Sequence, residues 1–343
     1  MEPLGNGAVA SVLSAFYGAA VGARNAAFDA FPYLSKLTGR PTISIGGIHA
    51  GGTGKTPLAL LVGRYALSRG YEPAFLSRGY RRKSTGAVIS APGTFDTWET
   101  VGDEPALLHA ALPQSWLGIG RNRLHGAKRL SPLLSKKAVF VLDDAFQHRH
   151  LKRDLDIACL PPGALNERLL PSGMLREPLK GLSRARCLCL IGTADDTAVL
   201  EDMKRALTAR FPKAEIVVMH QAPAGWVRLK TGEYRDTLPL IRPAALCGIA
   251  RPWRFIFLLK KLGISLSAQS IFNDHHVFKN HEIESIANGP GVSGIVTTEK
   301  DAFRLQSLKL VSWPDIWYLK IELVFSDERS HQLFNRIIDT VLP

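Results

Sequence analysis

Short hydrophobic runs of strand length alternate with helical patterns along most of the chain. Residues 43–48, 74–76, 115–119 and 138–142 form such runs in the first half, and residues 187–191, 215–219, 244–247 and 294–297 in the second. Between them, apolar residues recur at helical spacing, as in residues 58–67, 199–211 and 253–262. Apolar strands alternating with amphipathic helices are typical of a parallel sheet covered by helices. The pattern therefore predicts an α/β fold with a mostly parallel sheet.

A loop rich in proline and glycine interrupts this alternation. It lies within residues 161–182, and the strand and helix pattern restarts at residue 187. We therefore expect a core domain in residues 38–160 and a second, smaller α/β domain in residues 161–343, whose C-terminal part can return to the core. Residues 1–37 form a separate N-terminal segment.

The N-terminal segment has an unusual pattern for an enzyme. Residues 8–23 are almost free of charge, and apolar residues recur at helical spacing as far as Leu34. The uncharged stretch is shorter than the ~20 residues of a spanning helix. No positive charge precedes it, as a signal peptide would require. We expect an amphipathic helix that lies in a membrane interface, and the alternative is a helix packed on the core.

The first apolar run leads into a glycine-rich turn that precedes a helical pattern. This is the context of a phosphate-binding loop, in which backbone N–H groups and the positive end of the helix face phosphate oxygens. The expected nucleotide-binding residues are Gly51, Gly52, Thr53, Gly54, Lys55 and Thr56. Lys55 would reach the β- and γ-phosphates, and Thr56 would bind Mg²⁺. His49 occupies the position where the strict pattern has glycine, so an ordinary glycine turn is the alternative.

Acidic residues follow or flank several predicted strands. Asp143 and Asp144 end the run 138–142, which fits the second metal-binding element of nucleotidases with such a loop. Asp103 and Glu104 lie between Gly102 and Pro105, and we expect them on a turn rather than inside an element. A helix start with an acidic first turn is the alternative.

Two further groups of polar residues carry less specific signals. Residues 77–83 form a basic loop, which is either a solvated face or part of a binding site. His275 and His276 follow Asp274, but no third ligand has the spacing of a metal site, so we expect hydrogen-bonded or solvated side chains.

The composition indicates which classes of binding partner suit this protein, but it does not choose among them. The formal charge of +13 and the pI of about 9.7 favour polyanions, which include nucleic acid, an anionic membrane and phosphorylated substrates. No arginine-rich tract or nucleic-acid module is recognisable, so we expect no nucleic-acid partner. Cys187 and Cys189 lie in an apolar run, which indicates buried thiols and a reducing compartment.

Taken together, these motifs resemble the tetraacyldisaccharide 4′-kinase family over nearly the whole chain, as far as about Leu305. The matching blocks, in order, are GGTGKTP from residue 51, SRGY from 77, VGDEP from 101, DDAFQH from 143, RDLDI from 153, LLPSGMLREP from 169, DHH from 274 and TTEKD from 297. Several blocks in the right order make the resemblance specific. Three departures are small: Gly47 stands for a usual Asn, His49 for Thr or Ser, and Ala145 for Gly.

The resemblance implies a reaction and a location. The γ-phosphoryl group of ATP would be transferred, with Mg²⁺ as cofactor, to the 4′-hydroxyl of a tetraacylated glucosamine disaccharide 1-phosphate in lipid A biosynthesis, giving lipid IVA. The enzyme would be peripheral or monotopic at the cytoplasmic face of the bacterial inner membrane, with an anionic membrane surface as partner. The fold would be a P-loop NTPase-like core with a second domain.

The resemblance also implies roles for individual residues. Asp103 would accept the proton of the sugar hydroxyl, supported by His275 and with Lys55 on the phosphates. Arg123, Gln147 and Arg176 would steady phosphates on nucleotide or lipid. The expected metal ligands are Thr56, Asp143, Asp144 and Glu104.

Two other functions use the same features. A P-loop ATPase could couple hydrolysis to a macromolecular partner, and rapid ATP turnover without a glycolipid would favour it. A non-catalytic membrane-binding protein with a relic nucleotide fold would show no ATP binding.

Overall fold

Thirteen strands of the described residues form one sheet that runs from one end of the protein to the other. The computed structural model describes residues 7–80, 82–308 and 313–342. Arg81 of the basic loop, residues 1–6 of the N-terminal segment, and residues 309–312 and 343 of the expected second domain lie outside the described residues. The strand order is β11-β10-β12-β13-β8-β7-β6-β1-β5-β2-β4-β3, with β9 paired to β8.

The larger part of the sheet is a parallel core. It contains β1 (Thr42–Gly46), β2 (Glu72–Ser77), β4 (Trp116–Ile119), β5 (Ala138–Leu142), β6 (Leu155–Leu160) and β7 (Cys187–Gly192), all parallel to their neighbours, with the short antiparallel strand β3 (Val88–Ser90) at the edge. β1 lies at the centre, between β5 and β6, and all five of its residues are buried. The predicted mostly parallel α/β fold is therefore confirmed.

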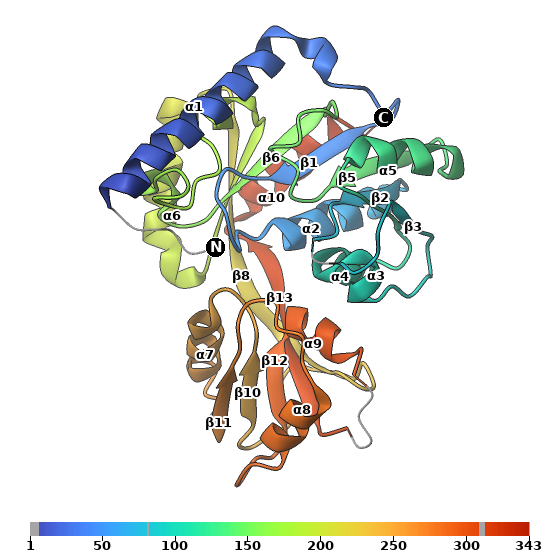
Figure 1. Ribbon diagram of the computed structural model, residues 1–343, viewed down its shortest axis with the longest axis vertical. Helices are drawn as coiled ribbons and strands as arrows, with labels where there is room; N and C mark the ends of the chain where they lie inside the picture. The colour runs from blue at the N-terminus through green and yellow to red at the C-terminus, as the bar shows by residue number, and fades with distance from the viewer. Residues whose placement is uncertain (1–6, 81, 309–312, 343) are drawn as a thin grey trace.

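Helices cover both faces of this core. On one face lie α2 (Lys55–Ser68), α4 (Asp103–Ala111) and the C-terminal α10 (Glu328–Asp339), which share a hydrophobic cluster with the central strands. The short α3 (Trp98–Val101) precedes α4. On the other face, α5 (Arg123–Leu130) and α6 (Thr197–Arg210) bury their apolar residues in two separate clusters. The chain thus forms three layers around β1 (Figure 1).

Two long antiparallel strands connect the core to the second part of the sheet. β8 (Glu215–Arg228) begins parallel to β7 and then pairs with β13 (Ile316–Phe325) from Met219 onward. Beyond them lie β10 (Ala244–Cys247), β11 (Ala268–Ile271) and β12 (Ile295–Thr298), with β9 (Tyr234–Arg235) beside β8. The helices of this part are α7 (Pro252–Lys261), α8 (Asn280–Ala287) and α9 (Glu299–Leu305), as Figure 1 shows.

The expected domain limits of 1–37, 38–160 and 161–343 stay a prediction. Around residue 160 the sheet is continuous, because β7 pairs with β6 across the predicted limit. Phe334 on α10 lies in the same cluster as Ile43 on β1, so the end of the chain contacts the core.

The N-terminal helix α1 (Ala8–Ala30) is present and lies outside the layers, across the segment that follows β6 (Figure 1). Polar residues contribute to its contacts with that segment: Ser14 Oγ donates to the Leu169 carbonyl at 3.0 Å, and Tyr17 Oη donates to the Arg176 carbonyl at 2.7 Å. Ala10, Val21 and Phe28 of the helix are buried as well. Apolar residues such as Val9 and Phe16 are more than 70% exposed. None of the helices in the described part of the chain combines the length and apolar character that crossing a bilayer requires.

Candidate active site

The loop between β1 and α2 has the geometry that its glycines allow. Gly51 and Gly54 have φ values of 102° and 78°, in the left-handed region that favours glycine. A Cβ on Gly54 would also lie 2.9 Å from Ile191. α2 begins at Lys55, one residue after the last glycine, so its N-terminal N–H groups face the loop. Pro57 is tolerated in the first turn of α2 because the N–H it lacks has no partner inside the helix.

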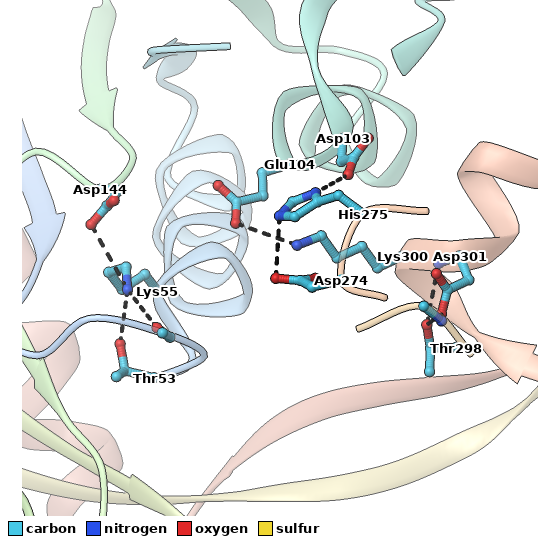
Figure 2. Close-up of polar contacts among 12 residues, drawn as sticks. Thr53, Lys55, Asp103, Glu104, Asp144, Asp274, His275, Thr298, Lys300 and Asp301 are labelled. Atoms are coloured by element: carbon cyan, nitrogen blue, oxygen red, sulfur yellow. Dashed lines mark hydrogen bonds and ion pairs between the residues drawn. The ribbon is translucent and has the colours of Figure 1, made fainter. Parts of the chain in front are cut away.

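Lys55 lies folded over this loop. Its Nζ donates to the Gly51 carbonyl at 3.0 Å and to Thr53 Oγ1 at 3.1 Å, and it lies 3.8 Å from Asp144 Oδ1 (Figure 2). Its side chain is only 11% exposed. The ammonium group is therefore held at the loop rather than directed into solvent.

Asp143 is the least satisfied carboxylate of the site. It is fully buried, and neither of its oxygens has a hydrogen-bond partner among the described residues. Burial raises the pKa of Asp143 to about 8, helped by the charges of Glu104 and Asp144 and opposed by Lys55. A buried carboxylate without donors costs free energy unless a cation or a proton neutralises it. The site therefore has a position that suits a cation.

Asp144, the next residue, is differently placed. Arg176 Nη1 donates to both of its oxygens, at 2.8 and 2.9 Å. Burial alone would raise the pKa of Asp144, but Lys55 and Arg176 lower it below the usual value. Its φ of 46° is unusual for a residue with a side chain. Asp144 is thus an ionised partner of two cations.

Asp103 and His275 come from the two parts of the sheet and meet. Asp103 begins α4 in the core, and His275 lies in the loop after β11. Their Oδ2 and Nδ1 atoms are 2.8 Å apart. A dashed line marks this contact in Figure 2. Because a carboxylate only accepts, Nδ1 carries the shared proton when the ring is neutral. His275 has a φ of 63°, and within the described ranges it shares a positive φ with just one other non-glycine residue, Asp144.

The acidic pair was expected on a turn, and this expectation was wrong. Asp103 and Glu104 are the first two residues of α4, and Gly102 precedes them with a φ of 97°. Acidic side chains in the first turn of a helix are stabilised by its positive end. The alternative of a helix start therefore holds. Glu104 lies between the Lys55 and His275 groups in Figure 2, with Lys300 Nζ 4.0 Å from its Oε1.

Arg304 is a residue of this site that the sequence did not single out. Its Nη2 and Nε donate to Asp103 Oδ2 at 2.6 and 2.9 Å. It lies on α9, three residues after the TTEKD block, and is 2% exposed. Burial would raise the pKa of Asp103, but hydrogen bonds from His275 and Arg304 lower it to about 2. The helical spacing of Asp301 and Arg304, one turn apart, was the available signal.

The three residues expected to contact phosphates have protein partners. Gln147 Nε2 donates to the Gly47 carbonyl and to Glu177 Oε1, both at 2.8 Å. Arg123 is buried, and its Nη2 lies 3.3 Å from the Asp144 carbonyl, while its Nε has no partner in the part of the chain that the structure describes. Arg176 pairs with Asp144 as described above.

Glu177 is a second residue to which the sequence pattern assigned no role. It is fully buried and accepts two hydrogen bonds from Arg184 at 3.0 Å and one from Asn25 on α1 at 2.8 Å. With the bond from Gln147, it connects α1, the loop after β6 and the loop after β5. A buried carboxylate with this many donors is typical of a structural centre.

Two of the three departures from the family pattern lie at the end of β1. A Cβ on Gly47 would be 2.5 Å from the Cys159 carbonyl oxygen, so this backbone needs glycine. His49 is 3% exposed, and its Nδ1 has no hydrogen-bond partner among the described residues. Burial lowers the pKa of His49 to about 4, so the ring is neutral at pH 7.

Comparison with known proteins gives the same family for the whole chain. A family model described as "Tetraacyldisaccharide-1-P 4'-kinase" matches residues 8–340. Tetraacyldisaccharide 4'-kinase of Chlorobium limicola is 35% identical over 344 residues, which cover 95% of this chain and 96% of the relative. The enzyme of the same name from Anaeromyxobacter sp. (strain K) is 38% identical over 320 residues, which cover 89% of this chain and 83% of the relative.

A solved structure is similar in fold over nearly the same length. The crystal structure of the "apo" form of LpxK from Aquifex aeolicus in complex with ATP superposes with a TM-score of 0.79 at 30% identity. The similarity covers 96% of this chain and 98% of that one. From the family model, the relatives and the shared fold, we conclude that this chain belongs to the tetraacyldisaccharide 4′-kinase family.

Proposed function

We propose that this protein transfers the γ-phosphoryl group of ATP to the 4′-hydroxyl of a tetraacylated glucosamine disaccharide 1-phosphate, which gives lipid IVA. The observation that carries the proposal is the contact between Asp103 and His275, beside a glycine-rich loop that ends in Lys55. A nucleotide loop alone would suit any P-loop ATPase. A buried acid–histidine pair, assembled from both parts of the sheet, suits an acceptor that must lose a proton.

The nucleotide binds at the start of α2 in this proposal. The backbone N–H groups of Gly51, Gly52, Thr53 and Gly54, together with those of the first turn of α2, would surround the phosphates. Lys55 would exchange its bonds to Gly51 and Thr53 for bonds to the β- and γ-phosphates. A charged hydrogen bond to phosphate is stronger than one to a neutral carbonyl, which favours the exchange.

The residues at the ends of β1 and β5 fit a bound Mg²⁺ ion. Asp143 offers two buried oxygens that have no donor among the described residues. Asp144 is already paired with Arg176, so we propose Asp143 as the direct ligand, with the Thr56 hydroxyl, and Asp144 and Glu104 farther out. Mg²⁺ binds few protein groups and keeps water and phosphate oxygens, so such a site needs no closed cage of side chains. When bound, Mg²⁺ neutralises charge on the phosphates.

Asp103 and His275 take the proton of the acceptor hydroxyl in the proposed reaction. Asp103 is ionised at neutral pH, and its hydrogen bond orients the His275 ring. Asp103 is a weak base. A weak base suffices because phosphoryl transfer passes through a loose transition state, in which positioning the hydroxyl matters more than early proton removal.

Arginines would hold the remaining phosphate charge. Arg123 has a buried Nε without a partner among the described residues, and a phosphate oxygen would satisfy it. Arg176 can shift from Asp144 toward a phosphate of either substrate. Gln147 donates its side-chain N–H groups to Gly47 and Glu177, so its contribution would be to keep the end of β1 in place.

We further propose that α1 lies in the membrane interface, at the cytoplasmic face of the inner membrane. An acceptor with four acyl chains resides in a bilayer, so the enzyme must work at its surface. α1 directs Ser14 and Tyr17 toward the protein and leaves Val9, Val12 and Phe16 exposed. Ala10, Val21 and Phe28 of the same helix are buried against the protein, and the exposed apolar residues near its start suit contact with lipid.

The test is a transfer assay with purified full-length protein, γ-labelled ATP, Mg²⁺ and a panel of glycolipids. We expect label on the tetraacylated disaccharide 1-phosphate, and none on an acceptor that lacks the 4′-hydroxyl. Rapid ATP hydrolysis that is independent of glycolipid would overturn the kinase assignment.

A further inference from the structure

Arg304 uses its guanidinium group entirely inside the protein. Besides the two bonds to Asp103, its Nη1 donates to Asp301 Oδ1 at 2.8 Å and to the Gly248 carbonyl at 2.9 Å. Four of the five N–H groups of an arginine are engaged in this way. The side chain is 2% exposed. Arg304 therefore has no free pair of N–H groups with which to bind a phosphate.

The contacts join four segments that are far apart in the sequence. Asp103 belongs to α4 of the core, and Arg304 and Asp301 to α9 of the second part. Gly248 follows β10, and its N–H donates to Asp301 Oδ2 at 3.0 Å. The carbonyl of Gly248 also accepts a bond from the His275 N–H at 3.0 Å. One guanidinium group thus fixes the carboxylate of Asp103 and the backbone that holds His275.

Three donor atoms from Arg304 and His275 converge on one oxygen of Asp103. Arg304 Nη2, Arg304 Nε and His275 Nδ1 all lie within 2.9 Å of Asp103 Oδ2. Arg304 Nη2 is also 3.2 Å from His275 Nδ1, so the three side chains meet at that point. Because the guanidinium plane is rigid, two bonds to the same oxygen fix the direction of the carboxylate more strongly than the histidine bond alone.

We propose that Arg304 is a positioning residue for phosphoryl transfer, which holds the Asp103 carboxylate and the His275 loop in the arrangement that meets the acceptor hydroxyl. This inference rests on the proposed function. It assigns no contact with nucleotide or lipid to Arg304. Loss of Arg304 should therefore slow the chemical step and leave nucleotide binding intact.

The first test compares three variants of the full-length protein in the glycolipid transfer assay. Arg304→Met removes every bond at similar length, and we expect kcat to fall about 10²-fold with the KM for MgATP unchanged. In Arg304→Lys, the lysine ammonium group can reach one of the partners Asp103, Asp301 and Gly248 but not all three. The kcat of this variant should therefore lie between those of wild type and Arg304→Met. Arg153→Lys is the matched control, because the Arg153 side chain is 6% exposed and paired with Asp156, away from Asp103 and His275. The kcat of this variant should stay within twofold of wild type.

A double-mutant cycle separates positioning from a general structural role. If Arg304 acts through Asp103, Arg304→Lys should lower kcat in the wild-type background but cost less than twofold in the Asp103→Asn background. Thermal melts show whether each variant is folded. Should Arg304→Met not fold, the cycle with Arg304→Lys still decides.

The outcomes distinguish this inference from the proposed function. If wild-type protein transfers no phosphate to any glycolipid, the proposed function fails. If wild type is active and the effects of Arg304→Lys and Asp103→Asn multiply, or if Arg304→Lys changes only the KM for MgATP, the positioning role is overturned. Full kcat in folded Arg304→Met would overturn it as well.

Discussion

Adjacent histidines 275 and 276 have different surroundings, and this difference defines what each can do. His275 faces Asp103 and lies 5.7 Å from the Tyr80 ring. His276 faces the other way: its Nε2 contacts both oxygens of Glu282 at 3.0 and 3.1 Å, and its ring stacks on Phe272 at 4.4 Å. The residue pattern presents them as equivalent, and only the family resemblance implied a role for His275. The fold brings His275 to Asp103 and His276 to the packing of α8.

The pair offers a matched test at the scale of one residue. We expect His275→Gln to lower kcat by about 10²-fold, because glutamine can keep a hydrogen bond to Asp103 but cannot exchange a proton. We expect His276→Gln to keep kcat within a few-fold of wild type and to lose about 1 kcal/mol of stability. Steady-state transfer rates and thermal melts of both variants measure this. Equal losses of kcat would contradict the assignment.

At the scale of an element, α1 contacts the protein through hydrogen bonds and through buried Ala10, Val21 and Phe28, and it leaves other apolar side chains exposed. Deleting it would also remove the bond from Asn25 to the buried Glu177, so a deletion would mix membrane binding with stability. Substitutions on the outward side avoid this problem. Val9 and Phe16 are 74% and 72% exposed and make no core contact that serine would break.

We therefore expect Val9→Ser combined with Phe16→Ser to weaken binding to anionic vesicles without lowering the melting temperature. Each buried apolar side chain contributes about 1.5–3 kcal/mol, so two should lower the partition coefficient at least tenfold. Vesicle co-sedimentation measures it. Val324→Ser, at an exposed position on β13, is the control and should bind like wild type. Unchanged binding of the double variant would exclude this side of α1 as the lipid contact.

The start of α9 carries a second feature at the same scale. Glu299 is its first residue, and burial raises the pKa of this carboxyl to about 7, despite the opposing charges of Lys320 and Arg64. Below pH 4.5 both folded and unfolded states bind the proton. Between about pH 4.5 and 7 only the folded state binds it, so protonation of Glu299 stabilises the folded state there. This contribution to the free energy of unfolding is lost as the pH rises through 7.

Glu299→Gln should remove that pH dependence. We expect the variant to melt at a higher temperature than wild type at pH 8 and at nearly the same temperature at pH 4.5. At pH 8 the wild-type carboxylate is charged in a partly buried position, which costs free energy, whereas the amide of glutamine is neutral at both pH values. The gain at pH 8 should be about 3 kcal/mol, because the pKa rises from 4.5 to about 7 and each unit corresponds to about 1.4 kcal/mol. Melting curves across this pH range measure the difference. A gain that is constant with pH would point to packing instead of charge.

At the scale of the whole molecule, the net charge of +13 and the exposed side of α1 should act together. Attraction between exposed charges is screened beyond about 10 Å at 0.1 M salt and about 3 Å at 1 M. We expect binding to anionic vesicles to weaken at least tenfold between these concentrations, and binding to neutral vesicles to change little. A salt-independent affinity for anionic vesicles would leave the apolar contact as the sole source of membrane binding.

At the same scale, the continuous sheet positions the residues of the candidate active site. β8 and β13 extend from the core into the second part, and they carry β10, β12 and α9 to the side of α4. Asp103 and His275, 172 residues apart, meet for this reason. Neither part of the sheet by itself contains both Asp103 and His275, so the continuous sheet brings the two residues together.

The sequence by itself determined the local features of this protein. The apolar runs predicted β1, β5 and β7, and the glycine turn between β1 and α2 was recognisable, because hydrophobic periodicity and glycine geometry act within a few residues. It also gave the helical pattern of α1 and the free, buried thiols of Cys187 and Cys189. The order of the family blocks identified the family, because several short motifs in one order rarely coincide.

Only the tertiary structure decided which side chains meet. Arg304 and Glu177 could not be singled out, because their partners are distant in sequence and a lone charged residue looks like any solvated one. The start of α4 at Asp103 was likewise decided by Gly102 and by the packing of α4 on α2 and α9, not by the local turn signal. Non-local burial sets the free energy of a charged group, and burial is a property of the folded chain alone.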